Sequence, residues 1–211
     1  MMRTLTVGPL EVNCYILWDP ETRDAFVIDP GGDADAIGRV VEGEGLKVRY
    51  IVNTHGHFDH VGADGRLREL FEGAALAIHR LDAPLLADAH DHGVIFGAEL
   101  DPQPRPDELL DEGSVLEAGG LRLRVLHTPG HTEGGVCLYE QAEGLVFTGD
   151  TLFAGSVGRT DFPGGSFDAL IDSIKRKVLP LGDAVKVYPG HGPSSTIGRE
   201  KASNPFITGQ V

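Results

Sequence analysis

The 211-residue chain has little cysteine and no long apolar run. Its two cysteines, Cys14 and Cys137, stand in the apolar stretches CYIL and VCLY without a CxxC spacing, so we expect both in the core and no disulfide framework. No apolar run reaches the roughly 18 residues that a bilayer span needs, and the start MMRTLTVGPL has no apolar leader segment. The expected location is therefore cytoplasmic, away from membranes.

Positive charge is also scarce. Lysine and arginine number 18 against 32 aspartates and glutamates, which gives a formal net charge of −14. A nucleic acid would be repelled at long range, because no Lys/Arg run offsets this charge. A small anionic substrate stays open, since divalent ions and Arg159 would make a site locally positive. We expect a small-molecule substrate and no nucleic-acid partner; nothing in the chain indicates an oligomeric state.

Length and apolar content predict a single domain over residues 1–211, because 211 residues with 41% hydrophobic content can bury a substantial core. Strand-like runs and helical periodicities alternate in two rounds. The clearest helix is 167–178, with Ser166 as its N-cap. Residues 87–107, with prolines on alternate positions, are expected to form a surface loop beside the active site. The predicted strands are 4–7, 14–18, 25–28, 48–52, 76–78, 121–126, 136–139, 145–148 and 185–188.

The most informative feature that is present is THGHFDH, residues 54–60. In an extended backbone, side chains two apart share a face, so His55 and His57 can close on one metal ion. A bend after Phe58 would turn Asp59 and His60 toward a second ion. Imidazole nitrogen and carboxylate oxygen bind zinc and also suit iron and manganese. A surface loop needs none of these groups, so the pattern predicts a metal site.

Three more candidate ligands lie just beyond short apolar runs: His131 in TPGHTEGG, Asp150 in TGDTLF and His191 in YPGHGP. Strand ends can deliver such side chains to one edge of a sheet, and rigid elements hold a metal site better than loops do. A glycine precedes each of the three, and its tolerance of positive φ lets the chain cross the metals. Together with THGHFDH, these segments predict one shared metal centre.

This order of motifs resembles the metallo-β-lactamase superfamily. Within it, NCYIL, AGSVGRTDFPGG and PGHGPSSTIGREKASNPF look most like the glyoxalase II-type hydrolases, over a span from Asn13 to Phe206. The resemblance implies an α/β fold, the four-layer αββα sandwich. It also implies a short form, because the chain ends 20 residues after His191 and lacks the C-terminal helical extension of the long forms.

The family's metal ligands can be carried over residue by residue. The resemblance implies one metal held by His55, His57 and His131. It implies a second metal held by Asp59, His60 and His191, with Asp150 bridging the two. The cofactors would be two divalent ions, zinc in the first place, with iron or manganese as alternatives.

The activity that follows is that of a dinuclear metallohydrolase. A hydroxide shared by two ions about 3.5–4 Å apart is a nucleophile at neutral pH, because coordination lowers the pKa of water. Attack on a thioester releases a thiolate that needs little acid help. Asp59 and Asp150 are the expected catalytic carboxylates. The predicted reaction is glyoxalase II-like thioesterase chemistry on a substrate such as hydroxyacylglutathione.

Two alternatives stay open around the segment GRTDF. Arg159 matches the place of a basic residue near the substrate and is the candidate for binding a carboxylate, but an ion pair with Asp161 that orders the loop is equally expected. The same segment occurs in persulfide dioxygenases, which hold a single iron with two histidines and one carboxylate, here including His131 and Asp150. The ending PGHGPSSTIGRE favours the hydrolase.

Overall fold

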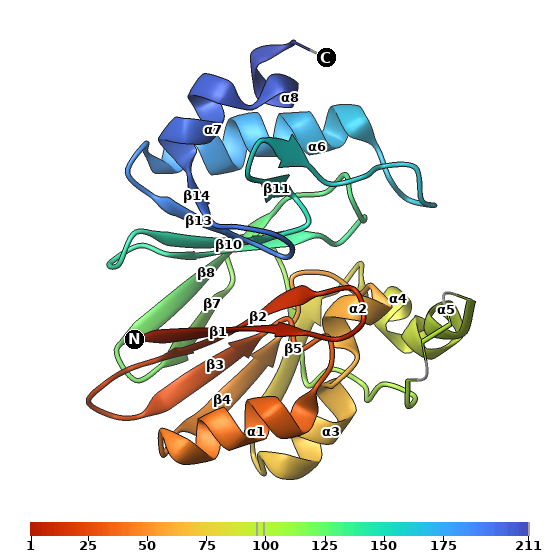
Figure 1. Ribbon diagram of the computed structural model, residues 1–211, viewed down its shortest axis with the longest axis vertical. Helices are drawn as coiled ribbons and strands as arrows, with labels where there is room; N and C mark the ends of the chain where they lie inside the picture. The colour runs from red at the N-terminus through yellow and green to blue at the C-terminus, as the bar shows by residue number, and fades with distance from the viewer. Residues whose placement is uncertain (96, 99, 211) are drawn as a thin grey trace.

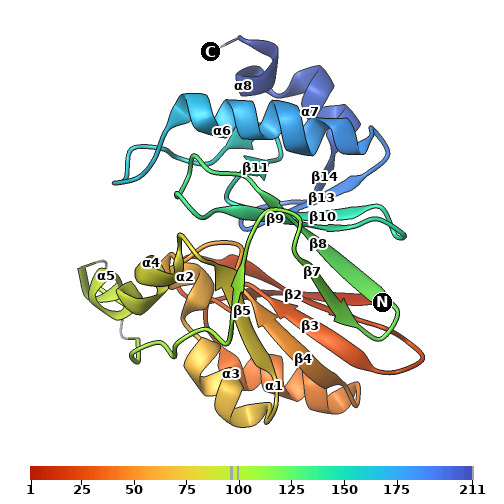
Figure 2. The same ribbon diagram turned by 180° about the vertical axis from the view of Figure 1, so that it is seen from behind.

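The computed structural model describes residues 1–95, 97–98 and 100–210. Two six-stranded sheets pack face to face, and helices cover the outer face of each (Figures 1 and 2). The predicted αββα sandwich is confirmed. No helix in these ranges is both long and apolar enough to cross a membrane.

The first sheet comes from the N-terminal half of the chain and has the order β1-β2-β3-β4-β5-β6. Its first three strands are antiparallel, and β3 to β6 run parallel. Helices α1 (Ala34–Gly43) and α3 (Asp64–Leu70) follow β3 and β4 and cover the outer face. The strands are β1 (Met2–Val7), β2 (Val12–Trp18), β3 (Asp24–Ile28), β4 (Lys47–Val52), β5 (Ala75–His79) and β6 (Glu108–Leu110).

The second sheet has the order β14-β13-β10-β9-β8-β7, and only its β10–β13 pair is parallel. Its outer face carries α6 (Phe167–Ser173), α7 (Ile197–Ser203) and α8 (Pro205–Thr208). A two-stranded ribbon, β11 (Leu152–Phe153) with β12 (Ser156–Val157), lies beside it. The strands are β7 (Val115–Ala118), β8 (Leu121–His127), β9 (Val136–Glu140), β10 (Leu145–Gly149), β13 (Lys186–Pro189) and β14 (Ser195–Thr196).

Three apolar clusters fill the layers. The central one lies between the sheets, where Phe26 of β3 and Phe147 of β10 are fully buried. The outer clusters pack α1 and α3 on the first sheet, and α6 and α7 on the second. Because each sheet is covered on both faces, the central strands read as continuous apolar runs rather than as alternating patterns. The two rigid sheets hold the loops at their shared edge.

Every predicted strand is present, within two residues at each end. The predicted helix 167–178 is also confirmed: α6 continues into a π-helical turn, η1 (Ile174–Val178), and Ser166 Oγ accepts a hydrogen bond from the Ala169 amide. The loop predicted at 87–107 is wrong in part, because the residues after α4 (Ala83–Ala87) form α5 (Ala89–Ile95). Residues 96 and 99 of that segment lie outside the described ranges. The helix was missed because its sequence AHDHGVI has no apolar periodicity.

Candidate metal centre

The seven residues predicted as metal ligands meet at one edge of the sandwich. THGHFDH follows β4 of the first sheet. His131 follows β8, Asp150 follows β10 and His191 follows β13, all of the second sheet. The site therefore lies where loops from both sheets converge, although its residues are spread over more than half of the chain.

THGHFDH folds as a short loop that leads directly into a helix. The Thr54 amide and hydroxyl donate to the carboxylate of Asp29, at 2.7 and 2.8 Å, and fix the start of the segment. The expected bend is the single turn of α2 (Phe58–Val61), which begins directly after His57. This turn presents Asp59 and His60 on a helix, while His55 and His57 stay on the preceding loop.

Among the described residues, the donor atoms form three groups of three. Two of these groups share no residue, and we call them the first and the second triad; the third group, His55, His60 and Asp150, joins them. Within each triad the donor atoms lie within 4.8 Å of one another. Asp150 lies between them: its Oδ1 is 3.4 Å from His60 Nε2, and its Oδ2 is 3.6 Å from His131 Nε2. The first triad is His55, His57 and His131, and the second is Asp59, His60 and His191.

Several of these donor atoms are buried without a hydrogen-bond partner in the described part of the chain. They are His55 Nε2, His60 Nε2 and Asp150 Oδ1. An unsatisfied buried polar atom costs about 1–3 kcal/mol, and a folded protein rarely leaves three of them together. A cation among these atoms would satisfy all three, so the donor set fits metal ions of the kind that nitrogen and carboxylate ligands bind.

The two triads differ in electrostatics. Burial lowers the pKa of both His55 and His57, and neighbouring imidazoles lower it further. Burial acts in the same direction on His60 and His191, but facing carboxylates outweigh it and raise their pKa. At neutral pH, therefore, His55 and His57 of the first triad offer neutral imidazoles, the form that binds a metal. The second triad combines imidazoles with negative charge.

Asp150, which lies between the triads, adds a further negative charge to the site. Burial alone would raise the pKa of its carboxyl group, but the surrounding histidines, His60 first, outweigh burial and hold the pKa well below its usual range. Asp150 is therefore ionised at neutral pH. An ionised carboxylate between two triads is the arrangement that a ligand shared by two cations requires.

Two hydrogen bonds and one ion-pair contact behind the ligands orient their rings. His131 Nδ1 lies 2.7 Å from the backbone carbonyl of Arg159, and His55 Nδ1 lies 3.1 Å from the Thr54 hydroxyl. His60 Nδ1 faces the Asp29 carboxylate at 3.1 Å. Each contact leaves the other ring nitrogen directed at the shared centre, as outer partners do in metal sites. Asp29 was not predicted, although its place at the end of β3, in DPGG, is a signal of the same kind as Asp150.

The three glycines before ligands serve two different purposes. Gly130 and Gly149 have φ of 139° and 46°, so the prediction of positive φ is confirmed for both. The prediction is wrong for Gly190, which is not among the residues with positive φ. A Cβ at Gly190 would instead lie 2.4 Å from Asp150 Oδ1 and 2.6 Å from His60 Cε1. Glycine is required there because the chain passes directly against the ligands.

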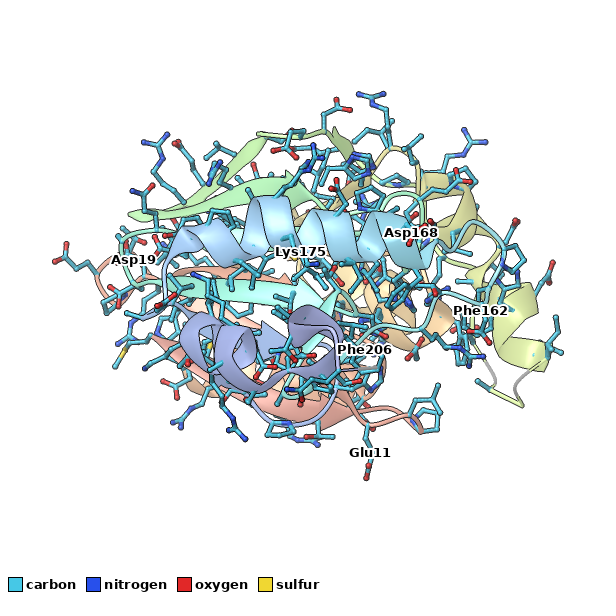
Figure 3. All side chains as sticks on the ribbon, turned by 90° about the horizontal axis from the view of Figure 1, so that it is seen from above. Glu11, Asp19, Phe162, Asp168, Lys175 and Phe206 are labelled. Atoms are coloured by element: carbon cyan, nitrogen blue, oxygen red, sulfur yellow. The ribbon has the colours of Figure 1, made fainter. Side chains whose placement is uncertain are left out.

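A cavity of ≈ 540 Å³ opens onto the triads. Its walls include Phe162, which lies at the same end of the molecule as α5 (Figure 3). Arg159 also lines it, but its guanidinium makes two 2.7 Å hydrogen bonds to Asp161 and lies 4.0 Å over the Phe162 ring. His92 of α5 lines the cavity as well. The remaining apolar wall was not predicted: Leu10, Phe58, Leu85 and Pro163.

Residues 7–191 match the family model of the metallo-beta-lactamase superfamily. The chain belongs to this superfamily. A hydroxyacylglutathione hydrolase, GloC, from Haemophilus influenzae is 39% identical over 204 residues, which cover 96% of each chain. Members of the superfamily are typically metal-dependent hydrolases, so hydrolysis at a metal site is the general chemistry indicated here.

Two solved structures extend the comparison. The B3 metallo-beta-lactamase BLEG-1 has a TM-score of 0.92 and 38% identity, and the match covers 99% of this chain and 100% of that one. TTHA1623, solved in a di-iron-bound form, has a TM-score of 0.89 and 39% identity, with 97% and 99% covered. Close relatives within the superfamily thus bear different activity names, and one of them holds iron.

Proposed function

We propose that the protein is a dinuclear metal-dependent hydrolase that cleaves a thioester such as a hydroxyacylglutathione. The observation that carries the proposal is the pair of triads with the ionised Asp150 between them, open to one cavity. The similarity to a hydroxyacylglutathione hydrolase over nearly the whole chain supports the thioester.

The proposed ligands follow from the geometry. His55, His57 and His131 would hold one divalent ion, and Asp59, His60 and His191 a second, with Asp150 shared. When bound, two such ions lower the pKa of a shared water so that a nucleophile is available at neutral pH. Zinc suits this donor set, and iron suits it too, in keeping with the di-iron neighbour.

The chain's own residues supply the rest of the reaction. Asp59 lines the cavity, and its Oδ2 lies 3.3 Å from His191 Nε2. From this position the carboxylate can orient an attacking water and accept a proton from it. The apolar residues around the opening limit access of bulk water to the reacting carbonyl. A leaving thiolate requires no dedicated acid, because a thiol ionises near pH 8.5. No serine or cysteine nucleophile is needed.

Metal stoichiometry tests the proposal first. Protein purified without added metal or chelator should contain close to two ions per chain by elemental analysis, and a thioester screen should then show hydrolysis. A single iron per chain, with oxygen consumption in the presence of a persulfide, would replace the hydrolase by the dioxygenase. Protein that binds no divalent ion with micromolar affinity would contradict both.

The bridging role of Asp150 has its own test. Asp150→Asn keeps the volume of the side chain but removes the charge between the triads. We expect metal occupancy and turnover to fall together, the latter by about 100-fold or more, beyond the 10–100-fold that outer-shell changes typically cost. Full activity with both ions retained would exclude Asp150 as the shared ligand.

A further inference from the structure

Asp82, which belongs to neither triad, joins the two loops that carry the first triad. One loop holds His55 and His57, and the other holds His131. Asp82 Oδ2 accepts hydrogen bonds from the Gly56 amide at 3.0 Å and from the Thr132 hydroxyl at 2.7 Å. Its Oδ1 accepts one from the Gly134 amide at 2.7 Å. A single carboxylate thus binds the residue between two ligands and the residues that follow the third.

The position of Asp82 in the chain makes this use of the carboxylate informative. Asp82 stands directly before α4, where an acidic side chain usually accepts hydrogen bonds from the first amides of the helix. Its side chain makes no such bond. All three of its donors lie instead on loops 26, 50 and 52 residues away in sequence. Its side chain therefore binds the loops at the edge of the sandwich and does not cap its own helix.

The residues around Asp82 are closely packed. Asp82 is only 2% exposed. A Cβ at Gly56 would lie 2.8 Å from the Asp82 carbonyl oxygen, and a Cβ at Gly134 would lie 2.5 Å from the Asp82 amide. Backbone from both loops therefore packs directly on this residue. Such contact transmits the position of Asp82 to both loops, since close-packed interiors do not absorb displacements.

We propose that Asp82 is a positioning residue that holds the first triad in its metal-binding arrangement. The inference rests on the proposed metal centre. A metal site binds tightly when its ligands are already in place, because the chain then loses little conformational freedom on binding. Asp82 fixes the two loops relative to each other without touching a ligand ring. The second triad has no hydrogen bond to Asp82 among the described residues, so its ion should depend on Asp82 far less.

Asp82→Asn is the principal test. The amide keeps the size of the side chain but replaces one acceptor oxygen by a donor, and in either orientation this donor faces a backbone amide, of Gly56 or Gly134, that also donates. Metal-free protein would be titrated with Zn²⁺ against a chromophoric chelator, and with Co²⁺ while the visible absorption of the bound ion is followed. We expect one of the two binding steps to weaken by about 10- to 100-fold, with an altered Co²⁺ spectrum, and the other step to change little.

Thr132→Val provides a milder variant in case Asp82→Asn does not fold. It removes one of the three donors and nearly preserves shape, so the same binding step should weaken by a smaller factor. If the folded variants bind both ions with the affinity and spectrum of the parent, the inference is overturned. If the parent itself binds no metal, it is the proposed function that fails.

Asp19→Asn is the matched control. Asp19 is also a nearly buried carboxylate with three donors, the amides of Glu21, Thr22 and Gly120. It lies at the opposite end of the molecule from Phe162 of the cavity wall (Figure 3). Its loss should lower the melting temperature and leave both metal affinities unchanged. A fall in affinity equal to that of Asp82→Asn would reduce the role of Asp82 to general stability.

Discussion

The two triads share one edge of the fold but are built from different donors. The first consists of three imidazoles whose rings contact one another, with centroids 4.7–4.8 Å apart. The second includes the carboxylate of Asp59 and is faced from behind by Asp29. The first thus contains imidazoles alone, and the second combines imidazoles with a carboxylate.

This difference shows how one fold can place two unlike groups of metal-binding side chains close together. Two identical anionic sites would repel each other when empty and would crowd negative charge into a buried volume. Here the charge is concentrated on one side, and Asp150 alone is shared. We therefore expect the second triad to hold its ion chiefly by charge. The first triad should hold its ion by geometry, which makes it the more sensitive of the two to loop position.

Removing one ligand from either triad should have the largest effect on metal content and turnover. His57→Ala and His191→Ala should each lower the metal content from about two ions to about one per chain. Turnover should fall by more than about 100-fold in both, because both ions are needed for the shared nucleophile. Elemental analysis and thioester kinetics on the two variants side by side provide the measurement. Each is the control for the other, and a variant that keeps both ions would remove its histidine from the ligand set.

Gly190→Ala should disturb the charged side of the centre. The added Cβ would press on Asp150 Oδ1 and His60 Cε1, so we expect a loss of about 1–3 kcal/mol of stability together with weakened metal binding. Thermal denaturation with and without Zn²⁺ measures both effects. Gly43→Ala at the end of α1 is the control, since its Cβ would meet no atom within 4 Å. An unchanged metal affinity in Gly190→Ala would show that the site tolerates the displacement.

Arg159→Ala tests whether the guanidinium near the first triad binds the substrate. The substitution keeps the backbone carbonyl that faces His131, so metal content should not change. If the guanidinium binds a substrate carboxylate, KM should rise by about tenfold with kcat nearly constant. Asp161→Ala, which releases the guanidinium from its ion pair, should then leave KM unchanged or lower it. An unchanged KM in Arg159→Ala would favour the loop-ordering ion pair.

Asp64→Asn tests how a buried carboxyl group behind the second triad affects the stability of the fold as the pH changes. Asp64 is fully buried, and the Asn53 amide that donates to it also lies 3.4 Å from the His60 carbonyl. Burial raises the pKa of Asp64 well above its usual value, so the folded state binds this proton more tightly than the unfolded chain, whose Asp pKa is about 3.9. The stability that this proton contributes to the folded state is complete below about pH 4, and it is lost as the pH rises through the pKa of Asp64 in the folded state.

The asparagine carries no such proton, so Asp64→Asn should be more stable than the parent at pH 7, with the gain shrinking toward pH 4. Urea denaturation at several pH values measures this. A gain that does not depend on pH would mean that Asp64 is not protonated in the fold.

The strands and the seven clustered donors could be predicted from the sequence because both are marked by local sequence patterns. Apolar runs mark strands, and a histidine or aspartate after a glycine at a strand end marks a loop at the sheet edge. Asp82 and Phe162 carried no local signal, since their significance comes from contacts with segments that lie distant in sequence. The reason for Gly190 was likewise misjudged, because a close approach to Asp150 and His60 is visible only in three dimensions.

Each triad draws two donors from the segment that follows β4 of the first sheet, on its loop or on α2, and one donor from the second sheet, His131 or His191. An ion in either triad would therefore cross-link the two halves of the sandwich. A ligand that binds only the folded state adds about 4 kcal/mol of stability at 1,000 times its Kd. Metal supply would then set how long the chain survives proteolysis as well as how fast it works. Its steady-state abundance would follow the free metal concentration of its surroundings.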